Sequence, residues 1–173
     1  MIRVRLKKKF DKALQKNYFY DAREWPYQNI ERRILAEPFI PTLGKRDSIE
    51  YKVSCFNGEV KFVTVCRGIA HAGYDDRTND HYTKAWEKLD WYVNYKPSDL
   101  NFPKLDFMDM LIDYCEKLSK DIPYVRVDWY YSDGKLYFGE FTFYTWGGFC
   151  PFVPEKWNET LGSWINLPTS IEK

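Results

Sequence analysis

The clearest pattern of apolar and polar positions lies at residues 124–143, where two runs of alternating residues are separated by an Asp-Gly pair at 133–134. Asp-Gly between β-prone runs predicts a hairpin. We favour a three-residue loop, which would set Asp128 opposite Glu140. A two-residue loop would slip the register by one and put the two carboxylates on opposite faces of the sheet.

With the longer loop, each face of this hairpin is chemically uniform, because side chains alternate across a strand. One face would carry Arg126, Asp128, Glu140 and Thr142, and the other would carry Val125, Val127, Trp129, Tyr137, Phe141 and Phe143. Two neighbouring carboxylates repel unless a cation or proton lies between them, and hard oxygen ligands suit Mg²⁺. The alternative is a solvated polar face with Arg126 in a surface ion pair, and the hairpin pattern alone leaves both open.

The rest of the chain predicts a second hairpin and flanking helices. Asn57-Gly58 joins strands at 49–56 and 59–67, with Lys52 and Arg67 on the polar side. Other expected elements are helices at 7–16, 106–120 (capped by Asp106) and 155–164, a strand at 33–37 ended by Pro38, a loop at 68–80 and a short strand within 82–91. Local hairpins separated by one long helix predict an α+β domain with a mainly antiparallel sheet.

Composition narrows the class of protein. The 173 residues carry a net charge of +1, so no global field favours nucleic acid, and the basic run at 3–9 is expected to be a solvated helix start. No apolar run is long enough to span a membrane and no secretory signal opens the chain, which favours a soluble, cytoplasmic protein. Cys55 and Cys115 are expected to be reduced core thiols, and His71 and His81 to be surface residues.

Four segments, taken in order, resemble the ATP-grasp superfamily: 34–40, 50–58, 125–128 and 138–143. Within it, the chain is similar to the TupA-like ATP-grasp proteins of polysaccharide and teichuronopeptide biosynthesis. The similarity runs from about Leu6 to Pro168. The resemblance implies a ligase that phosphorylates a small-molecule or polysaccharide carboxylate with ATP, after which a nucleophile attacks the acyl phosphate.

The resemblance also implies a role for individual residues, with ATP and Mg²⁺ as cofactors. The metal would be held by Asp128, Glu140 and Thr142, and Arg126 would steady phosphate oxygens. Glu37, Pro38 and Ile40 would form the adenine hinge, in which the Pro38 carbonyl accepts and the Ile40 N–H donates. Lys52 and Arg67 would contact phosphate or ribose. Thr142 stands where many ATP-grasp enzymes have Asn, which puts a second metal ion in question.

The resemblance covers the C-terminal lobe of such enzymes. We therefore expect a helical lead-in at 1–31, a lobe at 32–173, and a truncated or split protein that is inactive without an N-terminal half as partner. Alternatives are a non-catalytic nucleotide-binding or interaction module and a polysaccharide-pathway glycosyltransferase. Neither a nucleic-acid partner nor a membrane span is expected.

Overall fold

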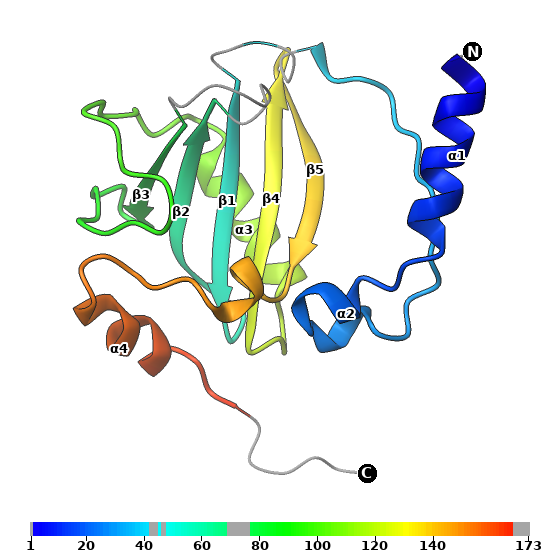
Figure 1. Ribbon diagram of the computed structural model, residues 1–173. Coiled ribbons are helices and arrows are strands. Elements are labelled where there is room, and N and C mark those ends of the chain that lie inside the picture. The colour runs from blue at the N-terminus through cyan, green and yellow to red at the C-terminus, as the bar shows by residue number, and fades with distance from the viewer. Residues whose placement is uncertain (1, 42–44, 46–47, 69–76, 168–173) are drawn as a thin grey trace.

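The sheet is the centre of the fold. The computed structural model describes residues 2–41, 45, 48–68 and 77–167 of the chain. Five strands pair in the order β3-β2-β1-β4-β5, every pair antiparallel (Figure 1). They are β1 (Ile49–Phe56), β2 (Glu59–Arg67), β3 (Thr78–Thr83), β4 (Tyr124–Ser132) and β5 (Lys135–Thr142). The predicted α+β class with an antiparallel sheet is confirmed.

Helices flank this sheet. They are α1 (Ile2–Leu14), α2 (Phe19–Ala22), α3 (Met108–Leu118) and α4 (Lys156–Ser163), with short 3-10 turns η1 (Trp25–Tyr27) and η3 (Thr145–Gly148). Helix α3 lies behind the sheet in Figure 1, η3 crosses in front of it, and α1 stands beyond the β5 edge. No helix in the described part of the chain is both long and apolar enough to cross a membrane.

Several expected boundaries are wrong. Residues 33–37, expected as a strand, are irregular and exposed. Strand β3 begins at Thr78, inside the expected loop, since it pairs with β2 over six residue pairs. Asp106 does not cap α3, whose N-cap position is Phe107 and has no side-chain cap bond.

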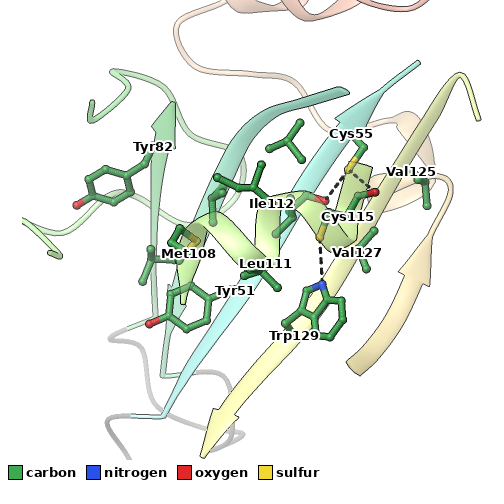
Figure 2. Close-up of a cluster of buried hydrophobic side chains, with 14 residues drawn as sticks. Tyr51, Cys55, Tyr82, Met108, Leu111, Ile112, Cys115, Val125, Val127 and Trp129 are labelled. Atoms are coloured by element: carbon green, nitrogen blue, oxygen red, sulfur yellow. Dashed lines mark hydrogen bonds between the residues drawn. The ribbon is translucent and has the colours of Figure 1, made fainter. Parts of the chain in front are cut away.

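One face of the sheet packs against α3 and forms the main core (Figure 2). The helix buries one stripe (Met108, Leu111, Ile112 and Cys115) against β-strand residues that include Tyr51, Val53, Val127 and Trp129. The indole N–H of Trp129 donates to Cys115 Sγ at 3.2 Å. Leu118, the last residue of α3, is 43% exposed. Cys55 and Cys115 are buried free thiols, as expected.

A second apolar cluster lies on the opposite side of the sheet, near α4. Its buried members are Phe56, Phe62, Trp91, Val93 and Leu161, with Trp157 and Trp164 packed against them. Phe56 and Phe62 come from the β1–β2 hairpin, at the end next to its turn. The face that lacks α3 is therefore aromatic at one end, and its remaining positions on β1, β4 and β5 are polar.

Candidate functional site

The second hairpin brings its polar residues together through a β-bulge. Ser132 pairs with Lys135, so the loop at 133–134 has two residues and the expected three-residue loop is wrong. The register then shifts by one between Val127 and Trp129, so Gly139 and Glu140 together face Asp128. A bulge adds one residue to one strand, and here it restores the alternation that the short loop would have broken.

Beyond the bulge, the four residues expected on one face do share it. Arg126 pairs with Thr142 in the ladder, and its Nη2 donates to Thr142 Oγ1 at 3.0 Å. The Thr142 hydroxyl donates to Glu140 Oε1 at 3.0 Å. Between the turn and the bulge, the residues of β5 point to the opposite faces from those expected. Tyr137 there pairs with Tyr130 on the polar face and does not lie on the face with Val127 and Trp129.

Asp128 is the buried centre of this polar face. Its side chain is 0% exposed, and three N–H groups donate to it. Arg126 Nε and Nη2 donate to its two oxygens at 2.7 and 2.8 Å, and Lys52 Nζ donates to Oδ2 at 2.5 Å. Lys52 reaches it from the neighbouring strand, where the two residues are paired in the β1–β4 register. Such a buried carboxylate is stable only with partners of opposite charge.

Glu50, which the sequence did not single out, extends this set of charges along β1. Its carboxylate lies 2.9 Å from Lys52 Nζ and its side chain is 6% exposed. Tyr130 is its partner across the β1–β4 ladder. Burial raises the pKa of Tyr130, and the Glu50 carboxylate, to which it is hydrogen-bonded, raises it further. Strand periodicity was the available signal, because residues 50 and 52 must point to the same side.

Glu140 lies at the exposed end of the same arrangement. Its side chain is 65% exposed, and one oxygen lies 3.6 Å from Arg126 Nη2. Carboxylates and cations therefore alternate across three strands, in the order Glu50, Lys52, Asp128, Arg126 and Glu140. We call these five residues the charge row.

Both cations of the charge row stay charged. Burial opposes the charge on Lys52, but Asp128 and Glu50 outweigh it and raise the pKa of Lys52. Burial also opposes the charge on Arg126, and its hydrogen bonds and attraction to Asp128 raise the pKa of Arg126. Two fixed positive charges beside a cavity are suited to oxygens of an anionic ligand.

Arg67 does not lie on the polar face with Lys52 and Arg126. A bulge between Ser54 and Cys55 shifts the β1–β2 register, so Arg67 pairs with Ile49, one step out of phase with Lys52. Arg67 therefore belongs to the α3 side of the sheet, and the expectation that it shares a polar face with Lys52 is wrong.

The expected adenine hinge is exposed irregular chain. Glu37 and Pro38 are exposed and Ile40 is half-buried, and none of the three lines the cavity described next. Their assignment to adenine therefore stays a prediction.

A cavity of about 1870 Å³ lies over the polar face of the sheet. Its floor includes Glu50, Lys52, Arg126, Glu140 and Thr142, and its walls come from the N-terminal segment and from η3. Ligand sites in proteins are commonly clefts of about 300–1,000 Å³, so this one has room for more than one small molecule.

The far end of the cavity, at β3, is lined by residues of this strand and next to it, among them Arg77 and Asn79. His81 lines it and is buried, contrary to the surface role expected from sequence; His71 lies outside the described residues. His81 Nδ1 is 2.8 Å from Thr64 Oγ1, and its ring stacks on Trp91 with centroids 3.7 Å apart. Burial lowers the pKa of His81 to about 3. The imidazole is therefore neutral at physiological pH.

The N-terminal segment borders the Glu140 end of the cavity. Tyr27, in η1, is hydrogen-bonded to the backbone of Phe143, just beyond β5. Burial raises the pKa of Tyr27, as do the nearby carboxylates of Glu24 and Glu140. Glu24 is itself buried. Residues far apart in the sequence therefore meet beside Glu140.

A comparison with known protein families identifies the chain. The profile of the TupA-like ATPgrasp family matches residues 1–166, nearly the whole sequence. The chain belongs to this family. No curated protein and no solved structure matches it significantly. The sheet with its flanking helices is consistent with an ATP-grasp lobe, and the TupA-like ATPgrasp assignment directs attention to ATP and Mg²⁺.

The charge row fits a magnesium ion under one condition. Mg²⁺ in proteins takes one or two carboxylates and completes its shell with water and substrate phosphates. Glu140 and Thr142 offer oxygens at the cavity, but Asp128 already accepts three N–H donors. In the described part of the chain, no three His, Cys, Asp or Glu residues gather as a ready metal cluster. A metal ion at Asp128 would therefore have to compete with a cation of the row.

Proposed function

We propose that this TupA-like ATPgrasp protein binds Mg-ATP on the polar face of its sheet and acts as an ATP-dependent carboxylate ligase. In such a reaction a carboxylate oxygen takes the terminal phosphoryl group, ADP leaves, and a nucleophile then displaces phosphate from the acyl phosphate. Membership of the family supports the ATP-grasp type of activity. The pathway, assembly of cell-surface polysaccharide or teichuronopeptide, comes from the family resemblance alone.

The observation that carries this proposal is the charge row, of which Glu50, Lys52, Arg126 and Glu140 line the floor of the cavity and Asp128 is buried between them. Lys52 and Arg126 are both within ion-pair distance of the buried Asp128, and Glu140 is exposed beside them. Transfer of a phosphoryl group gains most of its rate from positioning and from stabilising the negative charge of the phosphate oxygens. The fixed cations of the charge row can stabilise this negative charge, and the carboxylates next to them can help to position the phosphates through a metal ion.

Four residues of the charge row, together with Thr142, then have distinct tasks. Glu140, Thr142 and one oxygen of Asp128 would hold Mg²⁺, which when bound neutralises charge on the phosphates. Arg126 is held in place by its two bonds to Asp128 and presents its guanidinium to phosphate or acyl-phosphate oxygens. Lys52, 18% exposed at the cavity floor, is the second cation for the phosphates.

The adenine of ATP and the acceptor each have a candidate position. Glu37, Pro38 and Ile40 remain our candidates for the adenine, through the Pro38 carbonyl and the Ile40 N–H. A second lobe, in the same polypeptide or in another one, would complete the grip on the phosphates and sequester them from water. The β3 end of the cavity, which Arg77 and Asn79 line, leaves room for the acceptor.

Glu140→Gln tests the proposal most directly. The substitution removes one ligand charge from an exposed side chain and no volume from the core, so the fold should persist. We expect calorimetry to show loss of Mg²⁺-dependent ATP binding. Glu155→Gln, an exposed carboxylate just before α4, is the matched control and should bind like the parent. Equal Mg-ATP affinity in the Glu140 variant would refute this metal site.

Binding alone would not distinguish a ligase from a nucleotide-binding module. We therefore expect ADP to form only when Mg²⁺, a carboxylate acceptor and the second lobe are all present, and Arg126→Met to lower the rate of ADP formation by a larger factor than it lowers the affinity for ATP. Mg-ATP binding without ADP formation under all these conditions would favour the non-catalytic module.

A further inference from the structure

Lys52 has two carboxylate partners, and only one of them belongs to the proposed metal site. Its Nζ lies 2.5 Å from Asp128 Oδ2 and 2.9 Å from Glu50 Oε2. Glu50 and Lys52 are on the same face of β1, and Asp128 is directly across the ladder. All three side chains are more than four-fifths buried. The lysine charge is thus shared between an acid on its own strand and one on the next.

The second ion pair of Lys52 matters because most hydrogen-bonding positions of the Asp128 carboxylate are already occupied. Its carboxylate has about four lone-pair positions, and Arg126 and Lys52 already donate three N–H groups to it. Arg126 binds both oxygens in a fork that is geometrically strong. Lys52 donates only one hydrogen bond to Asp128, through a flexible side chain. A metal ion that binds Asp128 will therefore displace Lys52 more readily than Arg126.

We propose that Glu50 is a positioning residue that holds Lys52 when a divalent cation occupies Asp128. This inference rests on the proposed function. Without Glu50, a displaced Lys52 would be a buried charge with no partner, which is costly. With Glu50, the ammonium keeps an ion pair on its own strand and stays at the cavity floor. Glu50 thereby lowers the cost of metal binding without touching the metal.

The experiment uses Mn²⁺ alone as the probe, with free and bound ion separated by electron paramagnetic resonance. Glu50→Gln should weaken Mn²⁺ binding about tenfold, equivalent to about 1.4 kcal/mol, because Lys52 then depends on Asp128 alone. Lys52→Met should strengthen Mn²⁺ binding, because the competing cation is gone. Glu50→Asp keeps the charge and should restore part of the affinity, which also covers the case in which Glu50→Gln fails to fold.

A double-mutant cycle separates positioning from simple loss of charge. In Glu50→Gln/Lys52→Met, the effect of the Glu50 change should largely disappear, because no lysine remains to be held. Glu59→Gln is the control: Glu59 also pairs with a lysine two residues along its strand, Lys61 at 2.7 Å, but does not line the cavity. It should leave Mn²⁺ binding unchanged.

The outcomes separate this inference from the function on which it rests. If Glu140→Gln abolishes Mn²⁺ binding while Glu50→Gln leaves it unchanged, the metal site stands and the role of Glu50 is refuted. If the two Glu50 effects with and without Lys52 are equal, Glu50 acts by its charge alone and the inference also fails. If Glu140→Gln has no effect on Mn²⁺ binding, the metal site itself is wrong.

Discussion

The two hairpins of the sheet are built alike and differ in what their bulges do. Both have two-residue turns with positive φ at each central residue, 52° and 82° at Asn57-Gly58 and 50° and 77° at Asp133-Gly134. Both then shift register by one within the ladder. In the β1–β2 hairpin the shift moves Arg67 to the α3 side. In the β4–β5 hairpin it brings Glu140 and Thr142 beside Arg126 and Asp128.

The two hairpins also differ in what covers them. Most of β1 and β2 is buried on both faces, whereas no residue of β5 is fully buried. An exposed strand keeps Glu140 available to a ligand, while the covered strands hold Lys52 and Glu50 in fixed positions. Together they make a site with one rigid side and one accessible side, and the predictions below probe this difference.

The largest effect should come from Asp128, where the hairpins meet. Asp128→Asn leaves Arg126 buried without its carboxylate, and breaking a buried ion pair typically costs about 3–5 kcal/mol. We expect a loss of this size in the free energy of unfolding measured with urea. Asp133→Asn, in the exposed turn of the same hairpin, should change it by less than about 0.5 kcal/mol. Comparable losses in both variants would contradict the central place given to Asp128.

Acid should destabilise the protein through His81, at the β3 end of the polar face. Its pKa is about 3 in the folded protein against 6.5 for an ordinary histidine, because it is buried. The unfolded chain therefore binds a proton first, and stability that is complete above pH 6.5 falls as the pH drops towards 3. The histidine contribution is about 2 kcal/mol between pH 6.5 and 4.5.

Denaturation of the parent and of His81→Gln across this pH range isolates that contribution. Gln is neutral at every pH in this range. The stability of the His81→Gln variant should therefore fall less steeply with acid than the stability of the parent. Parallel pH profiles would mean that the imidazole has the same pKa in the folded and the unfolded protein.

A smaller effect should come from the β5 bulge itself. A Cβ added at Gly139 would lie 3.0 Å from the carbonyl oxygen of Asp128 and 3.1 Å from the Tyr130 ring. The backbone must shift to accept it, and crowding of this kind costs about 1–3 kcal/mol. Gly162→Ala is the control, because nothing lies within 4 Å of its added Cβ in α4 and alanine favours a helix. If the Gly139→Ala variant were as stable as the Gly162→Ala variant, the result would contradict the bulge at Gly139.

The sequence predicted the hairpins, the antiparallel sheet and the family, because turn residues and strand alternation are local signals. It did not predict the bulges, which are placed by cross-strand packing. Gly139 inside a strand was the one local hint of the second bulge. The expected face of Arg126, Asp128, Glu140 and Thr142 was therefore correct although the loop was wrong, while the face of Arg67 was wrong although the turn was right.

Burial was the other feature that sequence could not supply. His81 and Glu50 look like ordinary polar positions, and both are buried only because neighbouring strands and the aromatic cluster cover them. The partners that make this burial tolerable, Thr64 for His81 and Lys52 for Glu50, are fixed by register and by strand alternation. Their contribution to the site appears only in three dimensions.

The last prediction compares one cation from each face of the β1–β2 hairpin. Lys52→Met should weaken Mg-ATP binding about tenfold at saturating Mg²⁺, because a phosphate loses a charged donor worth about 1.4 kcal/mol. Arg67→Met removes an equal charge from the same hairpin, on the side that faces α3, and should leave the affinity unchanged. Isothermal titration of both variants measures the difference. Equal weakening by the two substitutions would mean that both cations contact the nucleotide, and that the β1–β2 bulge does not separate them as the register indicates.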